Sequence, residues 1–138
     1  MVLPVGTRFT LSDIKNRDLL NREVETEALR IFNSPKARRD RSLAKIKSDT
    51  VQGKTAEIWL SENFNFTLAP DIYHDLIDED GNYVEVKAYT GISNSENSIW
   101  LQDVLNRIRN GNWNKSKYLL LFNYNQGEYT FLEKIKIR

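Results

Sequence analysis

The chain has 138 residues, 28% of them charged, and a formal net charge of +1 at pH 7, which suits one ordinary globular domain with a modest core. It contains no cysteine, which excludes disulfides and thiolate metal sites, and its single histidine, His74, argues against a histidine-rich zinc site. No apolar run approaches membrane-spanning length, and residues 1–4 lack the charged and apolar regions of a signal peptide, so we expect a cytoplasmic protein with no membrane partner.

The first third of the chain predicts helices. Ser12 or Asp13 can begin a helix, and an approximate apolar stripe runs through residues 22–32 before Pro35 ends it. Residues 36–47 predict a second helix, which is basic and has few apolar positions.

A third helix is predicted from Thr55 to Phe64, directly after Gly53, with Trp59 and Leu60 on its buried face. The apolar alternation that follows is typical of strands, and Ser98 is a favourable helix cap. The remaining predicted elements are, in chain order, strands over residues 64–68, 72–77 and 83–89, a helix over 98–110, and strands over 118–122 and 128–132.

From residue 55 onward the predicted order is therefore α-β-β-β-α-β with one added strand. The run of apolar residues at 118–122 is typical of a strand that is covered on both faces. We predict an α/β fold, in which a mixed central β-sheet has helices packed on it, preceded by N-terminal helices.

Charge is segregated along the chain. Residues 35–54 hold seven basic side chains against two acidic ones, whereas residues 56–86 hold eight acidic side chains and no Lys or Arg. Basic side chains attract a polyanion, and concentrated carboxylates can hold the cation that neutralises it locally. A solvated basic helix beside an acidic loop is the alternative interpretation. The residues predicted to bind a nucleic-acid backbone are Lys36, Arg38, Arg39, Arg41, Lys45 and Lys54.

The most specific signal lies in residues 74–87, which predict two short strands joined by an acidic turn. Side chains two apart on a strand share a face, so Glu85 and Lys87 lie together, and the hairpin brings Asp75 back toward Glu85. Two carboxylates and an ammonium group at one point suit a hard divalent cation and a phosphate ester. An exposed acidic hairpin, with Glu85 and Lys87 as a surface pair, is the alternative.

Each member of this group has a predicted role in metal-assisted phosphodiester cleavage. Asp75 and Glu85 would coordinate Mg²⁺, for which Mn²⁺ can substitute, and the Val86 carbonyl would be a further oxygen ligand. Lys87 would lie beside the attacking water, lower its pKa and stabilise the pentavalent phosphate. Glu57, on the helix upstream, would add a third carboxylate or orient a metal-bound water.

This pattern of elements, with Asp75 and the Glu-Val-Lys sequence at residues 85–87 on adjacent strands, resembles the PD-(D/E)xK nuclease superfamily, which includes restriction endonuclease-like and Holliday junction resolvase-like proteins. The resemblance covers residues 53–132, and residues 53–57 are similar to the helix that precedes the motif in resolvase-like members. It implies a restriction endonuclease-like fold, with the Asp and the Glu as metal ligands, Lys87 as the catalytic lysine and Glu57 as an accessory ligand.

The chain departs from the motif of that family at one position. His74 stands where the family usually has a proline, and a literal Pro70-Asp71 lies upstream. Asp71 is therefore the alternative motif aspartate. We favour Asp75, because its separation from Glu85 suits a tight hairpin and because the strand continues after it.

We expect a Mg²⁺-dependent DNA endonuclease. Residues 1–52 would form a helical, basic segment that contacts DNA or forms a homodimer, and residues 53–138 would form the nuclease core. A homodimer is expected because one site cuts one strand, so a double-strand or junction cut requires two copies. Two alternatives stay open: an RNA-cleaving, toxin-type nuclease with the same metal site, and a non-catalytic nucleic-acid-binding module. Trp113, in the loop after the 98–110 helix, either stacks on a base or anchors that loop.

Overall fold

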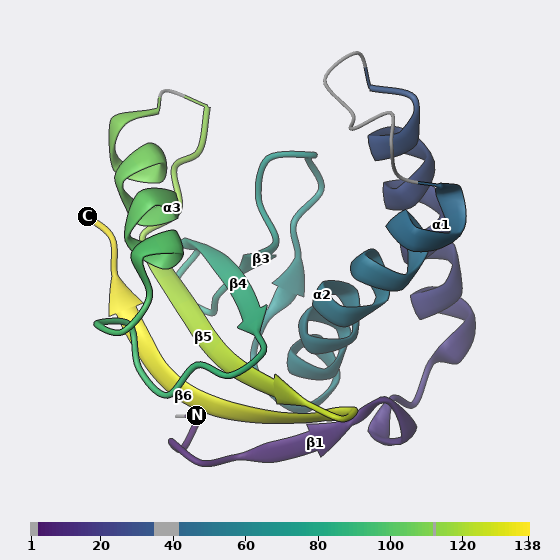
Figure 1. The fold of residues 1–138 in the computed structure, drawn as a ribbon, viewed down its shortest axis with the longest axis horizontal. Helices are drawn as coiled ribbons and strands as arrows, with labels where there is room; N and C mark the ends of the chain where they lie inside the picture. The colour runs from purple at the N-terminus through teal and green to yellow at the C-terminus, as the bar shows by residue number, and fades with distance from the viewer. Residues whose placement is uncertain (1–2, 35–41, 112) are drawn as a thin grey trace.

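The computed structural model describes residues 3–34, 42–111 and 113–138. Helices lie on both faces of a curled, six-stranded sheet, which gives this part of the chain a three-layer α/β architecture (Figure 1). The elements are, in chain order, β1 (Arg8–Thr10), the 3₁₀ helix η1 (Leu11–Asp13), α1 (Arg17–Phe32), α2 (Leu43–Asn63), β2 (Thr67–Leu68), β3 (Leu76–Ile77), β4 (Tyr83–Tyr89), α3 (Ile99–Asn110), β5 (Tyr118–Asn125) and β6 (Glu128–Lys136).

The strands are ordered β1-β6-β5-β4-β3-β2 in the sheet. Strands β4 and β5 are parallel, and the other four neighbouring pairs in this sheet are antiparallel. Two parallel strands need a long crossover connection, and α3 supplies it. The predicted mixed α/β sheet is confirmed, and from α2 onward the described elements are a helix, three strands, a helix and two strands.

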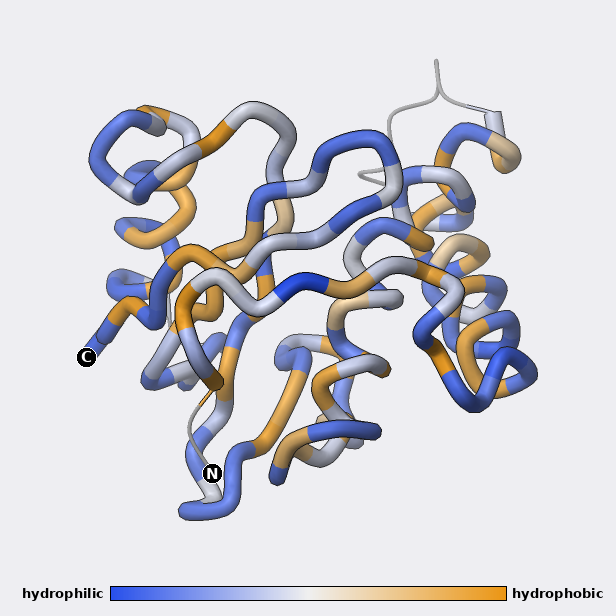
Figure 2. Tube along the Cα trace, turned by 90° about the horizontal axis from the view of Figure 1, so that it is seen from below, coloured by the Kyte–Doolittle hydropathy of each residue, from blue (hydrophilic) through white to orange (hydrophobic). Residues whose placement is uncertain are grey.

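Two hydrophobic cores lie on opposite faces of the sheet. On one face, Val84, Val86 and Leu120 pack with side chains of α1 and α2, and on the other face Leu119 and Leu121 pack with side chains of α3. Strand β5 is thus buried on both faces, as its apolar run predicts. Figure 2 shows hydrophobic and hydrophilic positions mixed along the helices. Helix α3 buries one side, with Leu101, Leu105 and Ile108, whereas α2 is buried on all sides over residues 55–60.

Helix α2 runs without a break from Leu43 to Asn63, so the predicted helix start after Gly53 is wrong. A glycine inside a helix costs about 1 kcal/mol relative to alanine, which is small beside the burial of side chains such as Trp59 and Leu60. The expected division between residues 52 and 53 falls within this helix. Neither α2 nor another helix in the described part of the chain is long and apolar enough to cross a membrane.

Several strand ends differ from the predictions, whereas β4 and α3 agree with them. Strand β1 was missed because it has three residues, and it pairs with β6, which extends to Lys136. Strands β2 and β3 have two residues each, so they are shorter than predicted. Between them the chain is held by other contacts, including the N–H of Ala69 donating to the carbonyl of Asp75 at 3.0 Å.

Candidate active site

Asp75 lies where β3 stops pairing with β4. The two residues of β3 pair with Val84 and Tyr83, and the next N–H that β4 directs to this side belongs to Val86. Oδ2 of Asp75 accepts that N–H at 2.8 Å. Because the N–H and C=O of one strand residue point to the same side, the Val86 carbonyl also faces Asp75. The shortness of β3 therefore brings the predicted aspartate to the middle of β4.

Glu85 is buried and held by the segment that leads into β5. Its Oε1 accepts hydrogen bonds from Nδ2 of Asn114 at 3.0 Å and from Oγ of Ser116 at 3.4 Å. All three side chains are buried. Asn114 and Ser116 were not predicted as site residues, because polar residues in a loop ordinarily face solvent. Strand periodicity gives no signal for them, because it places Ser116 on the face of Tyr118 and Val84, opposite to Glu85.

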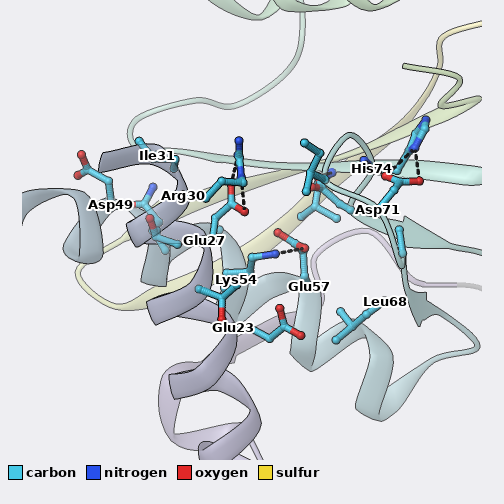
Figure 3. Close-up of a pocket in the computed structure, with 18 of the residues that line it drawn as sticks. Glu23, Glu27, Arg30, Ile31, Asp49, Lys54, Glu57, Leu68, Asp71 and His74 are labelled. Carbon is cyan, nitrogen blue, oxygen red and sulfur yellow. Dashed lines mark hydrogen bonds and ion pairs between the residues drawn. The ribbon is translucent and has the colours of Figure 1, made fainter. Parts of the chain in front are cut away.

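Helix α2 contributes a third carboxylate and a second ammonium group. Oε1 of Glu57 lies 3.4 Å from Nζ of Lys54 (Figure 3), and Glu57 is 6% exposed. The charges of Asp75 and Glu85 act on Glu57, and those of Asp75, Glu85 and Glu57 act on Lys87. The four predicted catalytic residues are thus brought together, and Lys54 joins them.

Burial raises the pKa of all three carboxyl groups. Burial and the nearby charge of Asp75 raise the pKa of Glu85 to about 7. The same two causes raise the pKa of Glu57 well above its usual range. Burial also raises the pKa of Asp75, although the ammonium of Lys87 and the N–H of Val86 oppose this shift. A divalent cation bound beside these carboxyl groups would favour their ionised forms and lower their pKa values.

Both lysines of the site keep their positive charge. Burial alone would lower the pKa of Lys87, but the carboxylates of Asp75 and Glu85 raise it above its ordinary value. Burial acts on Lys54 in the same way, and the carboxylates of Glu57 and Asp75 raise its pKa. Two ammonium groups therefore lie beside the carboxylates at neutral pH, where they can bind the oxygens of a phosphate.

Lys54, Glu57, Asp75 and Lys87 border a cleft of about 690 Å³, and Glu85 lies behind its lining. Helices α1 and α2 line it on one side, and residues 68–75 and β4 line it on the other (Figure 3). From α1, Glu23, Glu27 and Arg30 reach the cleft, and Glu27 and Arg30 form an ion pair with one another. The cleft gives an extended ligand access to Asp75, Lys87 and the residues of α2.

Asp71, the alternative motif aspartate, binds His74. Both of its carboxylate oxygens lie 3.0 Å from Nδ1 of His74. Nε2 of His74 accepts the N–H of Lys115 at 2.8 Å, which assigns the ring proton to Nδ1. His74 thus joins the segment that carries Asp75 to the segment that carries Asn114. The positions of the two aspartates favour Asp75 as the partner of Glu85.

The residues predicted to bind a nucleic-acid backbone lie in different places. Lys45 is exposed on the first turn of α2 and lies 3.1 Å from Asp49, whereas Lys54 lies in the cleft with Glu57. The other four, Lys36, Arg38, Arg39 and Arg41, lie outside the described residues.

The donor set fits Mg²⁺ with two carboxylates. Within residues 3–34, 42–111 and 113–138, no three His, Asp or Glu side chains are grouped closely enough to hold one metal ion. Magnesium needs only one or two carboxylates, because water completes its octahedron. Asp75 accepts the N–H of Val86 through Oδ2, and Glu85 accepts hydrogen bonds from Asn114 and Ser116 through Oε1. The side chains of Asp75 and Glu85 also share a hydrogen bond, which a cation bound between them would replace.

Neither a protein-family model nor a curated protein matches this chain.

Proposed function

We propose that this protein is a Mg²⁺-dependent endonuclease that hydrolyses phosphodiester bonds in DNA, built on a restriction endonuclease-like core. One observation carries the proposal: the N–H of Val86 donates to Asp75, which gathers two carboxylates and the ammonium of Lys87 around one stretch of β4. The carboxyl groups buried at this point are oxygen ligands that a bound divalent cation would keep ionised.

Asp75 and Glu85 would hold the cation, together with the carbonyl of Val86. Glu57 lies on α2, apart from the pair, and would orient a cation-bound water by accepting a hydrogen bond from it. Bound here, Mg²⁺ would supply positive charge on the phosphate and a lowered pKa for the attacking water.

Lys87 would act through its charge and not as a base, because its raised pKa keeps it protonated at neutral pH. Its ammonium would stabilise the negative charge that develops on the attacking oxygen and on the pentavalent phosphate. Lys54, on the other side of the cleft, would bind a second phosphate oxygen. The same arrangement would cut one strand per site, so a cut through both strands would need a homodimer.

The proposal is tested by cleavage assays with Mg²⁺, Mn²⁺ or EDTA. The substrates are supercoiled plasmid, a four-way junction, single-stranded DNA and structured RNA. Wild type is expected to cut DNA only with a divalent cation, and Asp75→Asn and Lys87→Ala are each expected to lower the rate by roughly 10²- to 10⁴-fold.

Two surface variants provide matched controls. Asp103 lies on the exposed side of α3 and Lys136 is exposed at the end of β6, so Asp103→Asn and Lys136→Ala remove the same charges away from the site. Both should cut as wild type does. Cleavage that survives Asp75→Asn and Lys87→Ala would contradict the site, and cleavage of RNA alone would make the protein a ribonuclease. DNA binding without cleavage would make it a binding module.

A further inference from the structure

The residues before β5 alternate between buried and outward-facing side chains. Asn114 and Ser116 are buried and bind Glu85. The side chains between and beside them point the other way, because successive side chains of an extended segment lie on opposite sides. These residues are Trp113 and Lys115, which are exposed, and Lys117, which is partly exposed and whose Nζ lies 5.6 Å from the centroid of the Tyr118 ring.

A second aromatic ring lies beside the indole. The rings of Tyr73 and Trp113 have centroids 6.0 Å apart and are tilted by 48°, so neither ring covers the other. Tyr73 is 51% exposed and Trp113 is 53% exposed. The indole is also fixed against the end of α3, since a Cβ on Gly111 would lie 3.1 Å from Nε1 of Trp113. We call Tyr73, Trp113, Lys115 and Lys117 the aromatic-basic patch.

The aromatic-basic patch is attached directly to the candidate active site. One amide nitrogen, Nδ2 of Asn114, donates both to Oε1 of Glu85 at 3.0 Å and to the carbonyl of Tyr73 at 3.3 Å. The N–H of Lys115 donates to His74, which is next to Asp75 in the chain. Tyr73 thus lies on the segment that carries Asp75, and residues 113–117 are hydrogen-bonded to Glu85 and His74, so a ligand on the patch lies close to the carboxylate pair.

We infer that the aromatic-basic patch binds unpaired nucleotides of single-stranded DNA next to the bond that is cut. This inference rests on the proposed nuclease function and names its substrate class. Exposed rings stack on bases whose faces are open, which is true of an unpaired strand and not of a continuous duplex. Lys115 and Lys117, two and four positions after Trp113 in the chain, would supply the positive charge that the phosphates of such a strand need.

Binding is measured by fluorescence anisotropy in Ca²⁺, with a denaturing gel to verify that the DNA stays intact. The probes share one sequence of about 16 nucleotides, as unpaired DNA, as DNA duplex and as RNA. Wild type is expected to bind the unpaired DNA more tightly than the other two. Trp113→Ala should weaken that binding by about 5- to 100-fold and leave duplex binding nearly unchanged, whereas Trp113→Phe should keep most of it.

Trp100 provides a matched control. It is 63% exposed on the first turn of α3, about 15 Å along the helix from the end that precedes Trp113. Trp100→Ala should bind as wild type does, and circular dichroism compares the folding of all the variants. Equal affinities of Trp113→Ala and Trp100→Ala, tighter binding of the duplex, tighter binding of RNA, or no binding of any probe would each overturn the inference.

The basic half of the patch is tested by salt. Lys115→Ala should reduce the slope of log affinity against log salt concentration by about 0.7 for the unpaired probe, and the control Lys136→Ala should not. An unchanged slope in Lys115→Ala would remove that residue from the binding surface. Cleavage is measured separately in Mg²⁺. Binding that depends on Trp113, without any cleavage, would contradict the nuclease proposal. Cleavage of unpaired DNA at the same rate in wild type and Trp113→Ala would contradict the role of the aromatic-basic patch.

Discussion

The side-chain amide of Asn114 donates a hydrogen bond to Oε1 of Glu85 over 3.0 Å, and both residues are buried. A carboxylate at such a place depends on its donors, because it has left the water that would otherwise solvate it. The contact spans 29 positions of the chain and joins β4 to the segment before β5.

Asn114→Ala should destabilise the protein by about 1–3 kcal/mol, because it leaves a buried carboxylate with one donor fewer. The loss should be larger at pH 8 than at pH 5, since the missing donor matters most to the ionised form. Urea denaturation at the two pH values measures it. Asn106→Ala, on the exposed side of α3, is the control and should change the free energy of unfolding little.

Glu85→Gln should make the protein more stable than wild type at pH 8. The folded-state pKa of Glu85 is about 7, above its ordinary value of 4.5, so its contribution to stability is full below about pH 4.5 and is lost as the pH rises through 7. Glutamine carries no proton to lose. Thermal unfolding from pH 5 to pH 8 should show a gain on the order of 1–3 kcal/mol for the variant at the upper end. A variant that is less stable than wild type at pH 8 would contradict the raised pKa.

Mg²⁺ should raise the melting temperature of the wild-type protein, and more at pH 8 than at pH 6. Binding needs ionised carboxylates, and at pH 6 burial keeps much of the Glu85 population protonated. At a hundred times its dissociation constant, the cation would add about 2.7 kcal/mol. Differential scanning fluorimetry with Mg²⁺ and then EDTA measures the shift, and Asp75→Asn should abolish it. A shift that persists in Asp75→Asn places the cation elsewhere.

Asp71→Asn should mainly lower stability, whereas Asp75→Asn should mainly lower the rate of cleavage. Asp71 holds His74, so its substitution should weaken the link to Lys115 and cost stability of about 1–3 kcal/mol. Cleavage should fall less than about tenfold in Asp71→Asn and by roughly 10²- to 10⁴-fold in Asp75→Asn. Cleavage rates and urea midpoints of the two variants decide between the aspartates, and the reverse order would make Asp71 the motif residue.

Gly53→Ala should stabilise the protein by about 0.4–1 kcal/mol. Gly53 lies inside the continuous helix α2, and a Cβ there meets no atom within 4 Å, so alanine gains helix propensity without a clash. Urea denaturation measures the change. A loss of stability would instead agree with a helix that starts after Gly53.

The sequence was sufficient for elements whose signals are local. Strand β4 has strict alternation between the core face and the face of Glu85 and Lys87, and α3 has a capping serine and an amphipathic stripe, so both were predicted at their observed ends. The continuity of α2 was not predictable, because a glycine can stand either inside a helix or just before one, and the neighbouring residues do not distinguish the two cases. Only the packing of α2 against α1 and the sheet decides between the two.

Some residues of the candidate site were likewise predictable from local sequence, and others were not. A hairpin spacing brings Asp75 to Glu85, and the strand period puts Lys87 beside it, so these residues follow from the sequence. Asn114 and Ser116 do not, because the crossover through α3 returns them to Glu85 from about 30 positions away. Lys54 was predicted to bind a nucleic-acid backbone because it ends a basic stretch of the sequence, but its place in the cleft beside Glu57 was not predicted.

The hydrogen bond from Val86 to Asp75 makes one backbone amide a reporter on the site. In most of a sheet, an amide N–H donates its hydrogen bond to a carbonyl of the next strand, and the charge of that carbonyl does not change. The amide of Val86 donates to a carboxylate, which can gain a proton or bind a cation. The nitrogen and proton chemical shifts of this amide should therefore follow both events in a two-dimensional NMR spectrum. Occupancy of the carboxylate pair could then be followed residue by residue in solution, without any substrate and without any substitution.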